Sequence, residues 1–375
     1  MIKYLKYFFP SFMALVLIAT FLRGETYPTI FLAFFSLIII FGDFIKKEDK
    51  LEKFSYPFIL NLALYINLPI LLLLVFFVIS IFSNSLPLWY LNFFNNVLHI
   101  DITSLGKSFN IVDKFSIIFS TSLFIGSMGT VTAHELTHRK KKKFDMFIGN
   151  CLLSFSWDCN FAIEHVYGHH KNVCLDSDPA SAKRGENIYL FILRAIFDEQ
   201  ISGWRIESAR LKRKNKGLLN YNNRMLIGYL RSLILTILIF TFGGLKSTLV
   251  FLLCALVAKF LLEGINYIEH YGLVREEGKP VRMRHSWNSN HFFSSIYLYN
   301  VTRHSDHHRN SNLKYWELKP VDKDAPMLPY GYLTMLYFVL FLPFVYKFIM
   351  KKELQNWDNN FANDIEKSLL KNSIN

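Results

Sequence analysis

The chain has 375 residues, of which 52% are apolar and 17% aromatic, and it carries a formal net charge of +13. This length could form one large or two ordinary soluble domains, but the apolar fraction is high for a soluble fold. The charge is not accompanied by a nucleic-acid-binding motif, so we expect no nucleic-acid partner. The four cysteines form no CxxC pair, and we expect free thiols in a reducing compartment rather than disulfides or metal ligands.

Six long stretches of the chain are mainly apolar, and about 20 apolar residues are enough for a helix to cross a bilayer. Only helices satisfy their own backbone hydrogen bonds inside hydrocarbon, so we predict an all-α integral membrane protein. The first stretch resembles a signal peptide, but no small-x-small cleavage site follows it, which favours an uncleaved helix. Pro69 is expected to kink the third span. The expected spans are 7–22, 28–44, 57–82, 115–133, 226–242 and 248–265.

Lysine and arginine lie mainly on one side of these expected spans. By the positive-inside rule, this asymmetry places both termini and the long insert 144–225 in the cytoplasm. Within the insert, the basic stretch from Arg205 to Lys216 is expected to be helical, and it forms either a solvated face or a surface for a partner. The residues that carry the asymmetry are Lys3, Lys6, Lys46, Lys47, Lys50, Lys53 and Arg139 through Lys143.

The apolar stretch 328–350 contains Pro329 and Pro343. We therefore expect it to lie at the membrane interface rather than to form a seventh span. A single membrane domain is expected over residues 1–350, followed by a polar tail over 351–375.

Nine of the twelve histidines lie in four short stretches, HELTH, EHVYGHH, NYIEHYG and RHSDHH. Histidines spaced i, i+3 or i, i+4 share one face of a helix, as His134 and His138 do, and as His165 and His169 do. Any one histidine is more simply explained as a hydrogen-bonded polar group, but nine in this spacing indicate metal binding. We expect a cytosolic metal-binding segment over 266–327. The candidate ligands are His134, His138, His165, His169, His170, His270, His304, His307 and His308.

The number of candidate ligands predicts two metal ions. HExxH on a helix is also the zinc-protease motif, but zinc normally takes only three or four protein ligands. Nine imidazoles exceed the needs of one ion and suit two, at about four or five nitrogens each. Imidazole accepts zinc, copper, iron or nickel, so the residues alone leave the metal open.

Five carboxylates lie in or near the histidine stretches, where such groups often orient a ligating imidazole through its second ring nitrogen. The alternative is a local salt bridge on the same helix. For Asp178, which precedes Pro179, the alternative is a turn. Glu269 could even be a direct ligand. The remaining histidines, His99, His285 and His291, are left out of the ligand set. The five carboxylates are Glu135, Glu164, Glu269, Asp306 and Asp178.

Small residues form a stripe along the fourth expected span that ends beside the first histidine stretch. Close packing of helices is the usual reason for such a stripe. The alternative is a slot that holds a slim apolar chain with its end at the metals. The stripe consists of Ser122, Gly126, Gly129 and Ala133.

The four histidine stretches, in this order and at these separations, resemble the integral-membrane alkane hydroxylase (alkane 1-monooxygenase) family, within the membrane fatty acid desaturase/hydroxylase superfamily. The segments DSDPASAKRGE, RHSWNSNH and LPYGY resemble it too. NYIEHYGL, with glutamate before its histidine, is the element most similar to the alkane hydroxylases. Thr302 departs from the family pattern, in which glutamine precedes the last stretch, and this leaves the exact subfamily and the substrate open.

The resemblance implies a non-haem di-iron centre with two iron ions, O2 as co-substrate, and electrons from a rubredoxin with its reductase. The expected function is hydroxylation of the terminal carbon of medium-chain alkanes or similar apolar alkyl chains. The expected location is a bacterial inner membrane, surrounded by membrane lipid, with the active site and both termini on the cytoplasmic side. The alternatives are an acyl-lipid desaturase or an aryl-methyl (xylene-type) hydroxylase on the same scaffold, and a non-catalytic metal-storage or sensor protein.

Overall fold

The computed structural model describes residues 2–45, 47–48 and 50–372. Lys46, one of the lysines that predict the orientation, lies outside them. The described residues form helices and no β-strand, which confirms the predicted all-α fold class. The chain divides into two compact units. The first comprises Met1–Ile38, Tyr56–Cys159 and Leu226–Lys259, and the second Ile39–Ser55, Asn160–Met225 and Phe260–Asn375.

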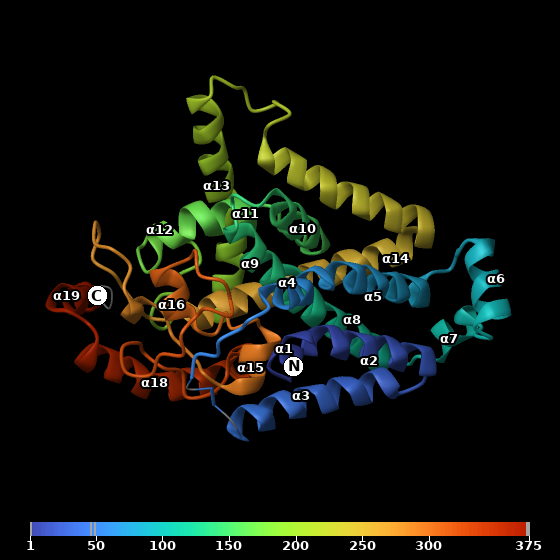
Figure 1. The fold of residues 1–375 in the computed structure, drawn as a ribbon, viewed down its shortest axis with the longest axis horizontal. Helices are drawn as coiled ribbons and strands as arrows, with labels where there is room; N and C mark the ends of the chain where they lie inside the picture. The colour runs from blue at the N-terminus through green and yellow to red at the C-terminus, as the bar shows by residue number, and fades with distance from the viewer. Residues whose placement is uncertain (1, 46, 49, 373–375) are drawn as a thin grey trace. The chain divides into compact units, whose positions relative to one another are not determined.

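The first unit contains most of the long apolar helices, labelled in Figure 1. Within it, α5 packs against α2, α7 and α8. Short 3-10 turns, η1 (Lys6–Phe8) and η3 (Ser154–Ser156), lie at helix ends. The helices are α1 (Ile2–Leu5), α2 (Phe9–Arg23), most of α3 (Tyr27–Ile45), α4 (Pro57–Tyr65), α5 (Asn67–Phe82), α6 (Leu88–Val97), α7 (Ile102–Ser108), α8 (Ile111–Phe124), α9 (Thr132–His138), α10 (Lys143–Leu153) and much of α14 (Arg224–His270).

The third expected span is two helices, α4 and α5, which meet at Ile66. Pro69 lies in the first turn of α5, where the missing N–H of proline costs no helical hydrogen bond. A buried polar link holds this junction, since Asn67 accepts from the hydroxyl of Ser11 and donates to Thr132, each at 2.8 Å. Because an unpaired amide in an apolar interior is costly, this link fixes α2, α5 and α9 together.

The helix that leads into the first histidine stretch is α-helical at both ends and π-helical in between. Asn110 and Asp113 form a capping box that begins α8. A π-helical segment, η2 (Ile125–Val131), then joins α8 to α9. A π turn holds more residues than an α turn, so it rotates the residues on either side of it relative to each other. The small residues of the stripe therefore do not continue along one straight face.

The longest helix, α14, contains one residue that is not helical, Gly244, with φ 73°. This left-handed conformation is accessible to glycine because it has no Cβ. At this glycine the two arms of α14 double back, as Figure 1 shows. The spans expected at 226–242 and 248–265 correspond to these arms. Among the described residues, five helical stretches are long and apolar enough to cross a membrane when α14 is taken as one stretch, so the count of six crossings stays a prediction.

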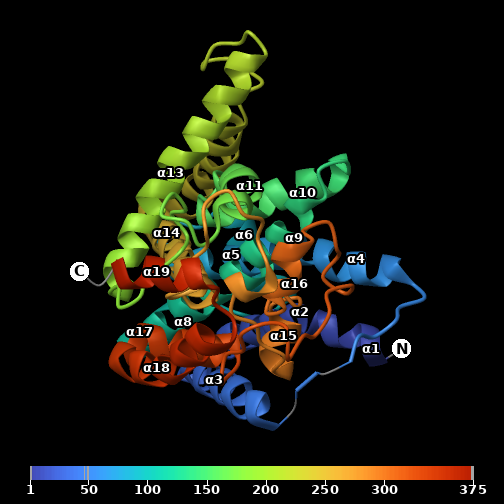
Figure 2. The same cartoon turned by 90° about the vertical axis from the view of Figure 1, so that its left-hand side faces the viewer.

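The second unit carries most of the histidine-bearing elements and the C-terminal helices. In it, α11 packs against α13, and α17 against α18 (Figure 2). The stretch expected at the interface, 328–350, contains α17 and the start of α18, and the expected polar tail contains the end of α18 and α19. The elements are α11 (Phe161–Glu164), η4 (His165–His169, π-helical), α12 (His170–Asn172), α13 (Ile188–Arg213), the end of α14, η5 (Met283–His285, 3-10), α15 (Phe292–Tyr297), α16 (His304–Arg309), α17 (Tyr332–Phe341), α18 (Pro343–Asn360) and α19 (Asp364–Asn372).

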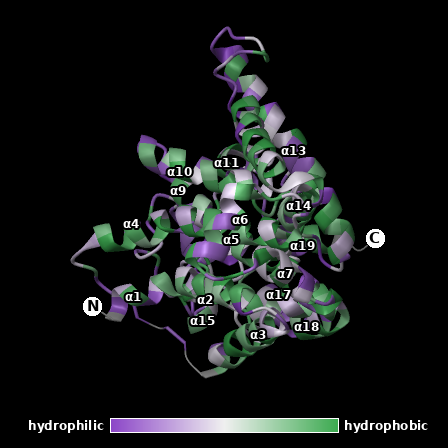
Figure 3. Cartoon of the chain, turned by 90° about the vertical axis from the view of Figure 1, so that its right-hand side faces the viewer, coloured by the Kyte–Doolittle hydropathy of each residue, from purple (hydrophilic) through white to green (hydrophobic). Residues whose placement is uncertain are grey.

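A buried carboxylate, that of Glu207, lies near the C-terminal end of α13. Glu207 accepts hydrogen bonds from the guanidinium groups of Arg210 and Arg224 and from the backbone N–H of Arg224. Burial alone would raise the pKa of Glu207, but the hydrogen bonds from the two arginines dominate and lower it from 4.5 to about 2. The loop that follows α13 is hydrophilic in part, as its purple stretches in Figure 3 show.

We expect this site to make the stability of the protein depend on pH. A carboxylate whose pKa is lower in the folded than in the unfolded chain stabilises the fold above its unfolded pKa and loses that contribution as pH falls. The melting temperature of the purified protein should therefore decrease as pH falls from 4.5 towards 2, the window set by the Glu207 pKa. Glu207→Gln should melt at a lower temperature than the parent at neutral pH, and its melting curve should change less across that window. An equal pH dependence in both proteins would contradict the assignment.

Candidate metal centre

Four buried histidines of the second unit meet at their Nε2 atoms. They come from the end of η4, the end of α14 and two positions of α16. Neighbouring Nε2 atoms are 3.2 Å apart between His169 and His308, 2.9 Å between His308 and His304, and 3.3 Å between His304 and His270. All four ligand atoms lie within 4.8 Å of one another. We call His169, His270, His304 and His308 the four-histidine cluster.

Oxygen acceptors behind two of these rings fix which nitrogen faces the cluster. Nδ1 of His169 lies 3.0 and 3.1 Å from the carboxylate oxygens of Asp178, and Nδ1 of His270 lies 3.1 Å from the backbone carbonyl oxygen of His285. A carboxylate or a carbonyl can only accept a hydrogen bond, so Nδ1 must carry the proton. In the neutral ring, Nε2 then presents a lone pair to the cluster, as a metal ligand requires.

The charges around the cluster also suit a cation. Burial would lower the pKa of His169, but the Asp178 carboxylate outweighs it and raises that pKa above its ordinary value. Burial and the neighbouring imidazoles hold the pKa of His308 well below its ordinary value. The Asp178 carboxylate therefore attracts positive charge to the cluster, whereas the His308 ring resists protonation. Four ring nitrogens that face one another fit one metal ion.

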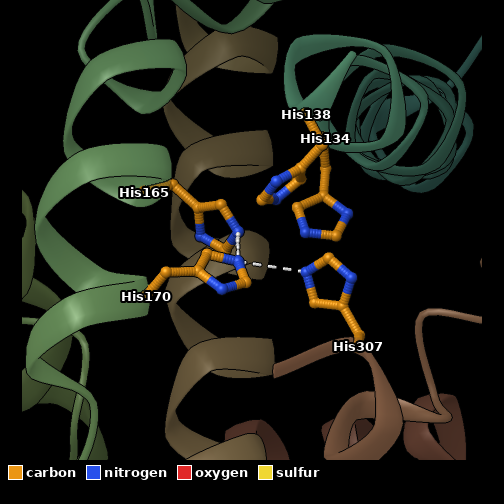
Figure 4. Close-up of side chains that lie close together, drawn as sticks. All are labelled: His134, His138, His165, His170 and His307. Carbon is orange, nitrogen blue, oxygen red and sulfur yellow. Dashed lines mark hydrogen bonds between the residues drawn. The ribbon is translucent and has the colours of Figure 1, made fainter. Parts of the chain in front are cut away.

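A second group of histidines in this unit, His165, His170 and His307, lies beside the first. Nε2 of His170 is 3.1 Å from Nε2 of His165 and 3.1 Å from Nε2 of His307, as the dashed lines in Figure 4 show. The rings of His170 and His308 stack with centroids 4.4 Å apart, so the two groups are neighbours. We call His165, His170 and His307 the three-histidine cluster. The imidazole nitrogens of this unit therefore form two adjacent groups, and the number of ions that they hold stays a prediction.

The spacing rule places His165 and His169 on one helical face, and their rings do stack, with centroids 5.1 Å apart. Their Nε2 atoms nevertheless belong to different clusters, because that of His165 lies beside His170 and that of His169 beside His308. The reason is that His165–His169 is π-helical, and in a π-helix the i, i+5 neighbours align. On α16 the i, i+4 pair His304 and His308 shares one cluster, while His307 joins the other.

The first histidine stretch lies in the other unit, at the end of α9. His134 and His138 are both buried, and their rings are in edge contact with centroids 4.9 Å apart. The i, i+4 spacing therefore brings these two rings together on one face of α9, as expected for α-helix.

The five predicted supporting carboxylates differ in what they contact. Asp178 binds His169, and one oxygen of Glu269 lies 3.3 Å from Nε2 of His304. The other Glu269 oxygen, Oε1, is buried and has no hydrogen-bond partner among the described residues. The other three have contacts away from imidazole: Glu135 pairs with Arg139, Asp306 with Arg309, and Glu164 accepts from Ser202.

The small-residue stripe has a packed and an open part. A Cβ on Gly129 would lie 3.4 Å from the side chain of Leu71, whereas a Cβ on Gly126 would meet no atom within 4 Å. Ser122 bonds to its own helix through the carbonyl oxygen of Ile118, and Ala133 is fully buried.

Residues 115–339 match the family described as fatty acid desaturase. The chain belongs to this family. It is 37% identical over 231 residues to alkane 1-monooxygenase 1 of Pseudomonas aeruginosa, a match that covers 60% of each chain. It is 35% identical over 262 residues to alkane 1-monooxygenase of Acinetobacter baylyi, covering 68% of this chain and 63% of the relative.

A third relative in this comparison has a different substrate in its name. The chain is 30% identical over 252 residues to the xylene/toluene monooxygenase hydroxylase component XylM of Pseudomonas putida, covering 67% of this chain and 68% of the relative. The chain spans only 60 to 63% of the length of the two alkane 1-monooxygenases. Membership of the desaturase family, together with the apolar helices, makes the chain a multi-pass membrane protein.

In this desaturase-family chain, we expect Asp178→Asn to weaken metal binding at the four-histidine cluster. The amide keeps the shape of the side chain but loses the charge, and it can turn an NH2 group towards Nδ1 of His169. Groups that orient a ligating histidine typically change metal affinity by about 10- to 100-fold. Metal titration of the purified protein should show this loss for one ion. Asp176→Asn, which changes an exposed carboxylate two residues away, is the control and should bind metal like the parent.

Proposed function

We propose that this chain is a membrane-bound non-haem di-iron monooxygenase that hydroxylates the terminal carbon of medium-chain alkanes or similar apolar chains with O2. The observation that carries the proposal is the convergence of seven buried or half-buried imidazoles into two adjacent clusters. The similarity to alkane 1-monooxygenases supports the substrate class.

The residues that would hold the two irons follow from the two clusters. The four-histidine cluster would hold one ion. The three-histidine cluster would hold the second, and we propose His134 and His138 as its other two ligands, because their spacing presents both rings on one helix face. Bound iron would supply the redox chemistry that inserts oxygen into an unactivated C–H bond, which acidic and basic side chains cannot perform.

The protein itself would orient the ligands and exclude water. Asp178 and the carbonyl oxygen of His285 would keep Nε2 of His169 and His270 directed inwards. Burial raises the pKa of Glu269 well above its ordinary value, but a bound cation would favour its charged form. Glu269, with one buried oxygen that has no hydrogen-bond partner among the described residues, would then add negative charge beside His304 that offsets the charge of the metals. The overall reaction places one oxygen atom of O2 in the C–H bond and releases the other as water, with consumption of two electrons and two protons.

Substrate selection would depend on shape, because an alkane has no polar group to recognise. Burial stabilises a bound chain by about 0.8 kcal/mol per methylene. The open space at Gly126 supports a place for part of such a chain along α8 and η2, while the contacts of Gly129 support packing. Within the stripe of Ser122, Gly126, Gly129 and Ala133, we therefore propose that the lining lies at Gly126, whereas Gly129 and the fully buried Ala133 favour packing.

The electrons would come from a rubredoxin with its reductase. An acidic carrier would find exposed positive charge at the end of α13, where Lys212, Arg213 and Lys214 face solvent. Arg210 is bound to Glu207 and would not take part. We place both termini and the active site on the cytoplasmic side of a bacterial inner membrane, on the distribution of lysines and arginines.

The decisive test is product analysis. Purified protein loaded with iron, given a chemical or enzymatic reducing system and O2, should convert straight-chain alkanes to primary alcohols when they are offered together with an acyl lipid and with xylene or toluene. His270→Ala should abolish turnover, because it removes a ligand from the four-histidine cluster, whereas His99→Ala should leave turnover unchanged. A fatty alkene as product would indicate a desaturase. Selective oxidation of xylene or toluene would favour the aryl-methyl hydroxylase that the similarity to XylM supports.

The exposed positive charge at the end of α13 yields a separate prediction. Reversal of Lys212, Arg213 and Lys214 to glutamate should raise the Michaelis constant for reduced rubredoxin and reduce its salt dependence, because charge complementarity mainly accelerates encounter. Metal content and the preferred chain length should not change. If carrier kinetics are the same as in the parent, these residues form only a solvated or lipid-facing surface.

A further inference from the structure

The C-terminal helix α19 places one buried carboxylate next to the metal-binding segment. Glu366 is 1% exposed. It accepts hydrogen bonds from Nε and Nη2 of Arg284 at 2.9 and 3.0 Å and lies 2.9 Å from Nε2 of His285. Two reciprocal hydrogen bonds with Asn363, the residue before α19, fix its conformation. The backbone N–H of Asn363 donates to the Glu366 carboxylate at 2.9 Å, and the backbone N–H of Glu366 donates to the Asn363 side-chain oxygen at 2.8 Å.

The carboxylate stays ionised in this position. Burial would raise the pKa of Glu366, but the hydrogen bonds from His285 and Arg284 dominate and lower it to about 2. Arg284 is itself largely buried, with 19% of its side chain exposed. Each of the two charges therefore depends on the other to remain in a mostly dry environment.

His285 has both ring nitrogens in use, so it is not free to ligate a metal. Its Nδ1 accepts from the backbone N–H of Arg282 at 3.0 Å, which leaves the proton on Nε2 for donation to Glu366. The imidazole is held between its own turn, η5, and α19. This contact fixes the position of the backbone at residue 285.

The carbonyl oxygen of His285 is the acceptor that fixes the tautomer of His270. It lies 3.1 Å from Nδ1 of His270 and also accepts from the thiol of Cys174 at 3.1 Å. If this carbonyl moved, the Nδ1 proton of His270 would lose its acceptor. The Nε2 lone pair would then no longer be held towards the cluster. The path from Glu366 to the four-histidine cluster therefore consists of one side-chain contact and one backbone contact.

We propose that Glu366 is a positioning residue for the metal ligand His270 and acts through His285. This inference rests on the proposed function. The C-terminal segment is thereby part of the metal centre, although it supplies no ligand. Trp357 of α18 supports the same turn, because its Nε1 donates to the carbonyl oxygen of Arg284 at 2.6 Å.

The test measures binding of Fe²⁺ to the metal-free, full-length protein without O2, in competition with a chelator. The parent should bind two ions. Glu366→Gln keeps the size of the side chain and its bond to Asn363 but leaves the Arg284 charge unbalanced. It should weaken the binding of one ion by about tenfold, the lower end of the range for groups that orient ligands, and leave the other unchanged. Asp364→Asn removes an exposed charge from the same turn of α19 and should bind both ions like the parent.

A double-mutant cycle distinguishes positioning from general stability. His270→Ala should weaken the same ion, and Glu366→Gln should add no further loss in that background, because it acts through the ring that is already absent. In the metal-free protein, Glu366→Gln should also speed hydrogen exchange at residues 282–287. If Glu366→Gln does not fold, Glu366→Asp replaces it.

The outcomes separate this inference from the proposed function. A parent protein that binds fewer than two ions would overturn both. Two outcomes would overturn only the role of Glu366, provided that the parent binds two ions. In one, Glu366→Gln binds both ions as tightly as the parent. In the other, Glu366→Gln weakens binding in the His270→Ala background as much as it does in the parent. A lower melting temperature with unchanged ion affinity would likewise reduce Glu366 to an anchor of α19.

Discussion

The metal centre depends on one constraint: an imidazole that ligates through Nε2 must keep its proton on Nδ1. For His169 and His270 this is achieved with oxygen atoms that can only accept, the carboxylate of Asp178 and the backbone carbonyl of His285. The two acceptors differ in charge. Asp178 brings a negative charge next to His169, whereas the carbonyl next to His270 brings only a dipole. Of these two rings, His169 therefore lies in the environment that attracts a cation more strongly.

The membrane explains why so much of this chemistry lies at helix ends and in turns. A helix inside hydrocarbon uses its backbone groups for its own hydrogen bonds and presents mainly apolar side chains. Polar ligands and the acceptors that orient them must then gather where helices end. His270 is the last residue of α14, and His169 is the last residue of the π-helical turn η4. The carbonyl of His285 is available because a short 3-10 turn leaves its last carbonyl groups without helical partners.

The sequence predicts the local parts of this arrangement and not the distant ones. Hydropathy predicts the all-α fold and the positions of the long apolar helices, and histidine spacing predicts which side chains are candidate ligands. The π-helical winding of His165–His169 has no clear sequence rule, so the division of its histidines between two clusters could not be predicted. Glu366 lies 81 residues from His285, in a segment expected only to be a polar tail. No periodic pattern reports such a contact, because only the tertiary fold brings the two residues together.

The division of α16 between the two clusters has a mechanical consequence. This helix has six residues, and it contributes His304 and His308 to one cluster and His307 to the other. So short a helix moves as one body, because its residues share the same few backbone hydrogen bonds. Arg303, at its N-terminus, is tied to Glu48 by a buried ion pair, and Asp306 accepts from the backbone N–H of Lys319 at 2.9 Å. These contacts with protein groups hold α16 in its position. A change in its position would move the imidazoles of both clusters at once, so the two histidine clusters share one structural support.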